Sequence, residues 1–363
     1  MRILTFAGTR PQLIKAATLS RQLRQLDEIV LAITGRTNEM NLLLSDFIDA
    51  PKPDYSLGIE SGESSERLAK IIMSAENVID EADPDLVITI GDTDTTFGAS
   101  LSSVKSGYPL AHIDAGVRIY DRSLPEEMNR RLTDHISDIF FCSTPSCLDN
   151  LSKEGIFRNV FLTGDLMVDA LLSTSKISLQ KSSILQSIGV EDKKYIVLAI
   201  HSMRTIEKLD SAGQIFSAIE SAGIKTVFAM DSKIDKALSE AGLSDNVRGN
   251  PNLVVTSPMS YTDFIRLIMG SEKILTDSGV IQREAYILKV PCITLRSYTE
   301  WPETVQDGWN ILVGTDKDKI ENAIRTLEPT GMQRAVFGEG KTAIKMARVL
   351  HEGLRDILSE GED

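Results

Sequence analysis

Short apolar runs alternate with longer amphipathic segments through most of this chain. In the N-terminal half, five runs have the length and the content of Val, Ile and Phe that buried strands have: RILTFAG, EIVLAITG, DLVITIG, PLAHIDA and DIFFCST. The segments between them, the first from about Pro11 to Leu26, read as helices. This alternation predicts a parallel sheet wound with helices on both faces, over residues 1–170.

A second series of the same kind follows a polar segment. Residues 176–194 are rich in Lys and Ser and poor in strand formers, so we expect the connection between two domains there. Six further strands are predicted within residues 190–340: YIVLAIH, KTVFAM, NLVVTS, KILTDSG, PCITLR and NILVGT. The sequence therefore predicts two doubly wound, Rossmann-like α/β domains facing a cleft. A last helix from about Gly338 to Glu360 is expected to carry residues 341–363 back to the first domain.

Composition and charge narrow the class of protein. The 363 residues exceed the usual size of a single core, and the net charge of −13 argues against nucleic acid or an anionic membrane as the main partner. No apolar run reaches membrane-spanning length, and the first strand is too short for a signal peptide. Three cysteines form no CxxC pair, so we expect reduced thiols and neither a zinc site nor a disulfide framework. These features predict a soluble cytoplasmic protein.

Charged residues gather between residues 91 and 146, where predicted strands end. Asp92 follows DLVITI and Asp114 follows PLAHI, so both lie at the carboxyl edge of the sheet, where open α/β sheets bind ligands. Glu126, Arg118 and Arg130 lie nearby in the sequence. A carboxylate at a strand end often only caps the next helix, as GDTDTT could, but three carboxylates with two arginines favour a chemical site.

The predicted second domain has a candidate site of its own, where a strand ends in Asp277, Ser278 and Gly279 and a helix begins at once. Backbone N–H groups at a helix N-terminus, with a serine hydroxyl, can bind a phosphate without lysine. Glu284, six positions after Ser278, could accept hydrogen bonds from both hydroxyls of a ribose. The alternative is an ordinary N-capped helix with a surface glutamate, which a lone DSG turn indicates more often.

Basic residues and one histidine complete the candidates. Arg10 and Lys15 follow the first strand in GTRPQLIK, where both could face a diphosphate, although solvation would explain Lys15 equally well. His201 ends the first strand of the second domain and would project into the same cleft, but a lone histidine after an apolar strand is more often structural. The remaining histidines are interpreted as structural: His112, His135 and His351.

In their order along the chain, these motifs resemble those of the non-hydrolysing UDP-N-acetylglucosamine 2-epimerases. The matching strings, spanning Gly8 to about Gly314, are GTRPQLIK, GDTDTT, HIDAGVR, LPEEMNRRLTD, TDSGVIQREA and TEWPET. The resemblance implies a glycosyltransferase-B type fold, a homodimer, and interconversion of UDP-GlcNAc and UDP-ManNAc without a metal, nicotinamide or other cofactor. In that family the C2 proton is removed while UDP leaves C1, and UDP adds back with C2 reprotonated on the other face.

The resemblance also implies roles for individual residues. The positions of the family's catalytic carboxylates and of its histidine at the diphosphate are occupied by Asp92, Asp114, Glu126 and His201. The positions that bind substrate, namely the basic cleft residues, the phosphate-binding turn and the ribose-binding glutamate, are occupied by Arg10, Lys15, Arg130, Ser278, Gly279 and Glu284.

Several residues depart from the family pattern near these positions. Asp114 stands where the family usually has Glu, so its carboxylate reaches about 1.5 Å less far, and a misplacement of that order can cost about a hundredfold in rate. The family's HRxEN is HSMRT, which retains only His201, and DSGG is DSGV, with Val280 in place of a glycine. Each change alters the site geometry that the family pattern implies.

Other departures concern substrate range and regulation. The first of two glutamates is Arg283, GTRPE is GTRPQ with Gln12, and TERPE is TEWPE with Trp301; the last two widen the range of possible sugars. TGQH is TGRT at 34–37, and an expected histidine is replaced around residues 230–231. Because these two motifs belong, in part of the family, to a second UDP-GlcNAc site that activates the enzyme, no such site is expected here.

Three functions stay open at this stage. The first is a UDP-sugar 2-epimerase acting on UDP-GlcNAc or on a modified relative such as a UDP-2,3-diacetamido uronic acid. The second is a glycosyltransferase or hydrolase of the same fold, with Asp92 or Asp114 as the base toward an acceptor hydroxyl or water. The third is a non-catalytic nucleotide-sugar binder, which the departures from the family motifs would explain.

Overall fold

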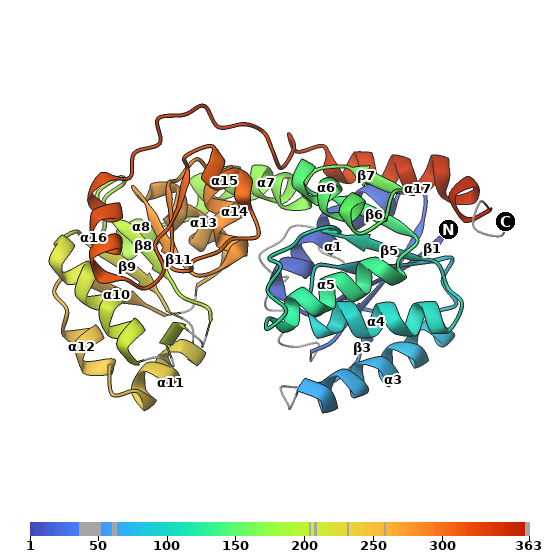
Figure 1. Cartoon of the computed structure of the whole chain (residues 1–363), viewed down its shortest axis with the longest axis horizontal. Helices are drawn as coiled ribbons and strands as arrows, with labels where there is room; N and C mark the ends of the chain where they lie inside the picture. Colours follow the sequence, from blue (N-terminus) through green and yellow to red (C-terminus); the bar gives the residue numbers. More distant parts are fainter. Residues whose placement is uncertain are drawn as a thin grey trace. The chain divides into compact units, whose positions relative to one another are not determined.

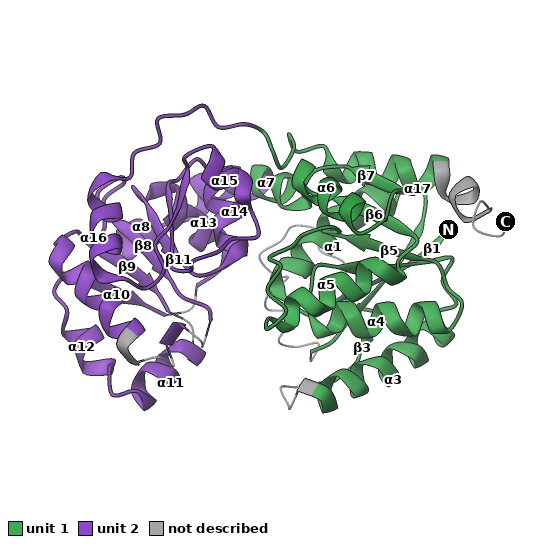
Figure 2. Ribbon diagram, in the orientation of Figure 1, with its two compact units in different colours: residues 1–172, 335–363 green, residues 173–334 purple. Residues whose placement is uncertain are grey.

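The structure is a computed structural model that describes residues 1–35, 52–59, 64–202, 205–206, 209–230, 232–257 and 259–359. The chain divides into two compact units, unit 1 with residues 1–172 and 335–363 and unit 2 with residues 173–334 (Figure 2). Each unit has one parallel sheet and its own hydrophobic core. The predicted α/β fold with two parallel sheets is confirmed.

Unit 1 is built on a seven-stranded sheet of order β3-β2-β1-β4-β5-β6-β7, in which every pairing is parallel (Figure 1). Its strands are β1 (Arg2–Ala7), β2 (Glu28–Ile33), β3 (Tyr55–Ser56), β4 (Leu86–Ile90), β5 (Leu110–Ile113), β6 (Ile139–Cys142) and β7 (Val160–Leu162). Its helices are α1 (Arg10–Leu23), α3 (Ser64–Ala82), α4 (Asp94–Lys105), α5 (Pro125–Ile136), α6 (Pro145–Lys153) and α17 (Thr342–Ser359). The helix α7 (Leu166–Lys181) crosses the unit boundary, with residues 166–172 in unit 1 and 173–181 in unit 2.

Unit 2 contains a six-stranded parallel sheet of order β10-β9-β8-β11-β12-β13. Its strands, each within a predicted run, are β8 (Ile196–Ala199), β9 (Thr226–Ala229), β10 (Leu253–Thr256), β11 (Ile274–Thr276), β12 (Cys292–Thr294) and β13 (Asn310–Leu312). Its helices are α8 (Ile184–Ser187), α10 (Leu209–Ala222), α11 (Ser232–Glu240), α12 (Ser244–Gly249), α13 (Tyr261–Gly270), α14 (Gly279–Ile287), α15 (Pro302–Gln306) and α16 (Lys317–Thr326).

Both sheets have a point where the strand order reverses, between β1 and β4 in unit 1 and between β8 and β11 in unit 2. In an open α/β sheet the crevice outside the carboxyl ends of the strands at that point is the usual place for a ligand. Gly8 and Asp92 come just after β1 and β4, while His201 and Asp277 come just after β8 and β11. The fold of each unit therefore places candidate residues at its reversal point.

The end of the chain packs with unit 1. Residues of α17 join the core cluster that contains β1 and α1, and His351 Nε2 lies 2.5 Å from Asp27 Oδ2. The polar segment 176–194 is mostly helical, since α7 continues to residue 181 and α8 follows. No Pro or Gly occurs in this stretch before Gly189, so the sequence is compatible with helices there. Among the described residues, no helix combines the length and apolar character that a membrane span needs.

Candidate active site

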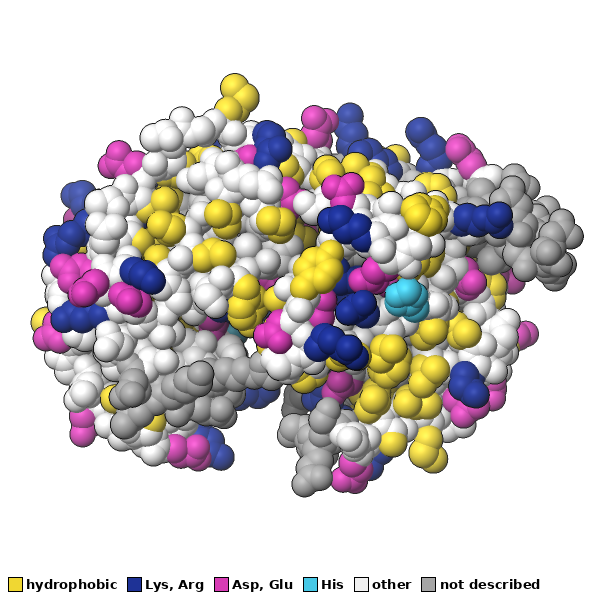
Figure 3. All heavy atoms as spheres, in the orientation of Figure 1, with side chains coloured by type: hydrophobic (Ala, Val, Ile, Leu, Met, Phe, Trp, Pro, Cys, Tyr) yellow, Lys and Arg dark blue, Asp and Glu magenta, His cyan; other side chains and the backbone are white. Residues whose placement is uncertain are grey.

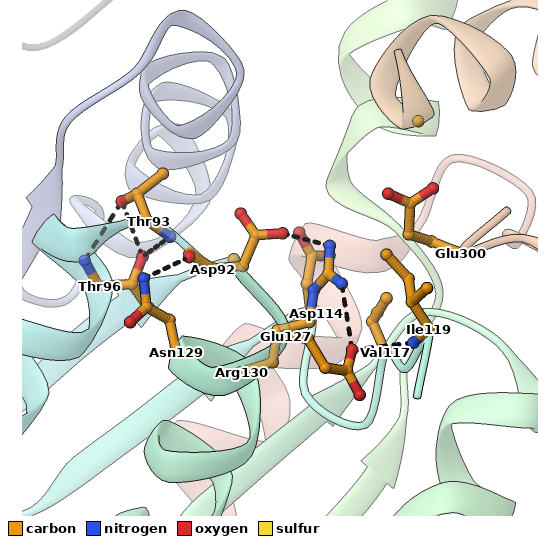
Figure 4. A network of polar contacts seen from close by, with 12 residues as sticks. Asp92, Thr93, Thr96, Asp114, Val117, Ile119, Glu127, Asn129, Arg130 and Glu300 are labelled. Atoms are coloured by element: carbon orange, nitrogen blue, oxygen red, sulfur yellow. Dashed lines mark hydrogen bonds and ion pairs between the residues drawn. The ribbon is translucent and has the colours of Figure 1, made fainter. Parts of the chain in front are cut away.

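Asp92 lies in the loop after β4 and pairs with Arg130 of α5. Arg130 Nη2 donates to Asp92 Oδ2, and Asn129 Nδ2 donates to the Asp92 carbonyl at 3.1 Å (Figure 4). The cap of α4 is Thr93, whose hydroxyl accepts from Thr96 N at 3.3 Å. Because Thr93 fills the capping role that Asp92 could have had, the Asp92 carboxylate is directed to Arg130 instead.

Asp114 follows β5 and is held by a buried cation. Lys15 Nζ lies 2.7 and 2.5 Å from its two carboxylate oxygens and 2.9 Å from Asp165 Oδ1, while Ser143 Oγ donates to Asp114 Oδ1 at 2.8 Å. Asp114 has a φ of 67°, in the left-handed region that Asp enters more readily than most residues. Lys15 is almost fully buried by this contact. Its observed partners are thus carboxylates of unit 1, and its contact with a diphosphate stays a prediction.

Two adjacent glutamates in the first turn of α5 have different environments. Glu126, the predicted catalytic residue, is exposed. Glu127 is fully buried, accepts from the backbone N–H groups of Ile119 and Tyr120 at 2.9 and 3.0 Å, and lies 3.5 Å from Arg130 Nη1 (Figure 4). Sequence reasoning did not single out Glu127. Helical spacing gives no signal for it, because Glu127 and Glu126 precede Arg130 by three and four positions, and both are contact spacings.

Gln12, one of the departures from the family pattern, is buried and bonded within unit 1. Its Oε1 accepts from Gly8 N at 2.7 Å and Thr9 N at 3.2 Å, and its Nε2 donates to the Ile90 carbonyl at 2.6 Å. The amide therefore ties the loop after β1 to the loop that carries Asp92. The Gln12 side chain is engaged by the protein, and the expectation that it widens the range of sugars stays a prediction.

Arg118, one of the charged residues between positions 91 and 146, is bonded within unit 1 and is no longer a candidate site residue. Its Nη1 lies 2.7 Å from Asp134 Oδ2, and its Nε and Nη2 donate to the two oxygens of Glu154 at 2.9 and 2.7 Å. Burial would lower the pKa of Arg118, but the hydrogen bonds to Glu154 and the charge of Asp134 outweigh it and raise that pKa. The Glu154 pKa is lowered mainly by its hydrogen bond with Arg118.

In unit 2, Asp277 holds the segment that begins with His201. Its carboxylate accepts from the N–H of His201 at 2.9 Å and of Ser202 at 3.0 Å, and from Thr205 Oγ1 at 2.6 Å. The His201 backbone is therefore fixed although HRxEN is absent, and its side chain is exposed. Residues 203 and 204 of this segment lie outside the described part of the chain. This role of Asp277 was not predicted from the sequence.

The turn after β11 leads directly into α14. Ser278 is the N-cap residue, but its side chain makes no capping hydrogen bond, so the plain N-cap interpretation does not account for it. Gly279 begins the helix, and a Cβ on it would lie 2.6 Å from Glu300 Oε2. Glu284 is buried and accepts a hydrogen bond from Tyr261 at 2.6 Å. Phosphate and ribose binding by these residues stay predictions.

Two further departures from the family pattern lie in contact with one another. The Arg283 guanidinium carbon is 4.7 Å from the centre of the Trp301 ring, and both residues are buried. Trp301 Nε1 donates to the Gly279 carbonyl at 2.9 Å. Trp301 therefore braces the first residue of α14. Its side chain, like that of Gln12, makes its contacts within the protein.

The sequence also makes predictions about metal sites, cysteines and an activating site. Within the described ranges, no group of His, Cys, Asp or Glu side chains is arranged to hold a metal ion. All three cysteines are buried, and none of them is in a disulfide. Of the motifs whose loss predicts no activating site, residues 36–37 and 231 fall outside the described part of the chain.

Comparisons with known proteins agree with this architecture. Residues 21–351 match the family model described as UDP-N-acetylglucosamine 2-epimerase. A protein of Methanococcus maripaludis named UDP-N-acetylglucosamine 2-epimerase homolog is 39% identical over 96% of this chain and 99% of its own length. A Pseudomonas aeruginosa protein named UDP-2,3-diacetamido-2,3-dideoxy-D-glucuronate 2-epimerase is 32% identical over 96% of this chain and 99% of its own.

A solved structure is also similar throughout. The crystal structure of Methanocaldococcus jannaschii UDP-GlcNAc 2-epimerase in complex with UDP-GlcNAc and UDP superposes with a TM-score of 0.91, at 34% identity, over 97% of this chain and all of the other. The family and enzyme class that the sequence motifs predict are confirmed: the chain belongs to the UDP-N-acetylglucosamine 2-epimerase family, whose members are isomerases.

Proposed function

We propose that this protein is a UDP-sugar 2-epimerase that interconverts UDP-GlcNAc and UDP-ManNAc, or a modified UDP-2-acetamido sugar, by elimination and re-addition of UDP. The observation that carries the proposal is the pair Asp92 and Asp114. Asp92 follows β4, which borders the reversal point of the first sheet, and Asp114 follows the neighbouring strand β5; each carboxylate is paired with a cation. A transfer or hydrolysis reaction would need one base, whereas inversion at C2 needs acid/base groups on two faces of the sugar.

The chemistry explains why both carboxylates and an anion site are needed. The C2 proton has no neighbouring carbonyl to acidify it, so its removal depends on the departure of a good leaving group from C1. In our proposal Asp92, Asp114 and the exposed Glu126 supply the groups that remove and return the C2 proton. Arg10, Arg130, His201 and the turn at Ser278 and Gly279 stabilise the charge on the departing diphosphate.

Two substrates fit the proposal, and a specific observation supports considering the second. The Pseudomonas aeruginosa relative is named for a diacetamido glucuronate, and it covers nearly the whole chain. The same C2 chemistry would serve either sugar. Gln12 and Trp301 both hydrogen-bond within the protein, and their effect on the choice between the two sugars stays a prediction.

We also propose that the protein is a cytoplasmic homodimer. Apolar side chains gather on the face of unit 1 formed by α3, α4 and α5, as Figure 3 shows. Met73 is 66% exposed, Leu132 41% and Val104 39%, one on each helix. Exposed apolar patches of this kind are typical of protein interfaces. Three cysteines without a disulfide fit a reducing compartment.

The test is proton NMR of the purified protein with UDP-GlcNAc in deuterated water. We expect the UDP-ManNAc anomeric signal to appear and deuterium to enter at C2, because the C2 proton exchanges during the reaction. Asp92→Asn and Asp114→Asn should each lower the rate by at least about a hundredfold, while Asp54→Asn, a control whose carboxylate accepts from Leu31 N, should not.

Other outcomes would lead to other functions. Free UDP with GlcNAc would show hydrolysis and overturn the epimerase. An unchanged spectrum with UDP-GlcNAc, followed by epimerisation of the diacetamido uronic acid substrate, would assign the second sugar. UDP binding with no turnover of either substrate would leave a nucleotide-sugar binder.

A further inference from the structure

A buried network of charged side chains lies beneath the loops that carry Asp92 and Asp114. At its centre is Asp134 of α5. Asp134 Oδ1 lies 2.7 Å from His112 Nδ1, and Asp134 Oδ2 lies 2.7 Å from Arg118 Nη1. All three side chains are completely buried. None of them is assigned a part in the reaction proposed above.

The network reaches the backbone of both loops. His112 Nε2 lies 2.8 Å from the Gly91 carbonyl, one residue before Asp92. On the other side, Gly116 N, two residues after Asp114, donates to Asp134 Oδ2 at 3.0 Å. One carboxylate therefore bonds directly to the loop of Asp114 and, through a single imidazole, to the loop of Asp92.

The hydrogen-bonding geometry depends on the charge of Asp134. Both ring nitrogens of His112 face acceptors, the Asp134 carboxylate and the Gly91 carbonyl. Arg118 lies between the carboxylates of Asp134 and Glu154 inside unit 1. Burial opposes ionisation of Asp134, but His112 and Arg118 outweigh it and hold the pKa of this carboxyl below its ordinary value.

We propose that Asp134 is a positioning residue that fixes both catalytic loops at once through His112 and Gly116. This inference rests on the proposed function for Asp92 and Asp114. Both loops have a glycine with positive φ at the point of attachment, Gly91 at 74° and Gly116 at 77°. Glycine permits these turns but does not hold them, because it has the widest choice of backbone conformations. The bonds to the network supply the restraint.

Asp134→Asn tests the proposal, with Asp138→Asn as the matched control. Asp138 is close by in the sequence and also accepts a backbone bond from β5, from Leu110 N at 2.8 Å, but at the strand's opposite end from Asp114. We expect Asp134→Asn to lower kcat about a hundredfold, with KM changed less than about threefold, because the reacting groups are displaced while the binding groups remain. Asp138→Asn should leave kcat within about twofold.

Amide hydrogen exchange gives a readout that does not depend on turnover. In Asp134→Asn, residues 90–94 and 113–119 should exchange faster than in the wild type and in Asp138→Asn. Unchanged exchange and unchanged kcat, or equal effects of the two variants, would overturn the proposal. If the wild type turned over neither UDP-sugar, the proposed function would fail, while the exchange experiment would still decide the role of Asp134.

A second variant covers the case in which Asp134→Asn does not fold. His112→Asn removes the link to Gly91 but keeps Asp134 and its bond to Gly116. We expect faster exchange in residues 90–94 and little change in 113–119. Equal loosening of both segments, or of neither, would contradict the arrangement of contacts proposed here.

Discussion

At the scale of single residues, the replacements at Arg283 and Trp301 are related, because the two side chains are in contact. Each departs from the family pattern, and together they form a buried contact in which the guanidinium carbon lies 4.7 Å from the ring centre. A cation over a desolvated indole is worth about 2 kcal/mol. We therefore expect a double-mutant cycle of Arg283→Ala and Trp301→Ala to give a coupling free energy of about 1–2 kcal/mol in the free energy of unfolding.

Urea unfolding followed by tryptophan fluorescence measures this coupling. Both tryptophans of the chain lie in unit 2, so the signal of Trp309 reports that unit when Trp301 is absent. The control pair is Arg296 and Tyr298, at 5.3 Å and only partly buried, whose coupling should stay below about 1 kcal/mol. If the coupling free energy of Arg283 and Trp301 is no larger than that of Arg296 and Tyr298, the family departures at Arg283 and Trp301 are independent of each other.

The sequence predicts the position of single residues better than their contacts. Asp92 and Asp114 follow strands, and parallel strands bring their carboxyl ends to one edge, so their place in the fold follows from the strand pattern. The partners of Lys15 and Gln12 do not follow from any pattern, because Asp165 and Ile90 are distant in sequence. Likewise, nothing local distinguishes the exposed Glu126 from the buried Glu127 before the packing of α5 is known.

At the scale of elements, Gly116 controls how closely the loop after β5 approaches α6. A Cβ on Gly116 would lie 2.3 Å from the Cys147 carbonyl oxygen, and its φ is 77°. Gly107 has a similar φ of 80°, but a Cβ there would meet nothing within 4 Å. Gly107→Ala should therefore cost about 1–2 kcal/mol in the free energy of unfolding, from the backbone conformation alone.

Gly116→Ala should cost clearly more than Gly107→Ala, because the clash with backbone adds to the same conformational strain. It should also lower kcat, since Gly116 N bonds to Asp134 two residues from Asp114. Thermal or urea unfolding followed by circular dichroism, together with the NMR assay, checks both statements. If Gly116→Ala and Gly107→Ala lose equal amounts of unfolding free energy, α6 moves away from the added methyl group at little cost.

The prediction of strands depends on the apolar runs that contain them. The five longer strands of unit 1 and all six of unit 2 lie within predicted runs, because buried parallel strands are continuous apolar segments. β3 and β7 were not predicted. β3 has two residues, and β7 is an isolated VFL between polar residues, whereas the equally short β11, β12 and β13 lie within predicted runs. The polar segment after residue 176 was interpreted as a connection, although Lys and Ser without Pro or Gly are compatible with the helix observed.

At the scale of the whole molecule, the remaining question is self-association, and the apolar face of α3, α4 and α5 provides the prediction. Met73 is the most exposed of its three large apolar side chains, so a charge there should oppose burial against a second copy. We expect Met73→Glu to change the mass measured by light scattering from that of a dimer to that of a monomer. Met332→Glu, at a 91% exposed methionine of unit 2, is the matched control and should leave the dimer intact. A Met73→Glu protein that stays dimeric at low micromolar concentration would place the interface elsewhere, and a monomeric wild type would contradict the homodimer itself.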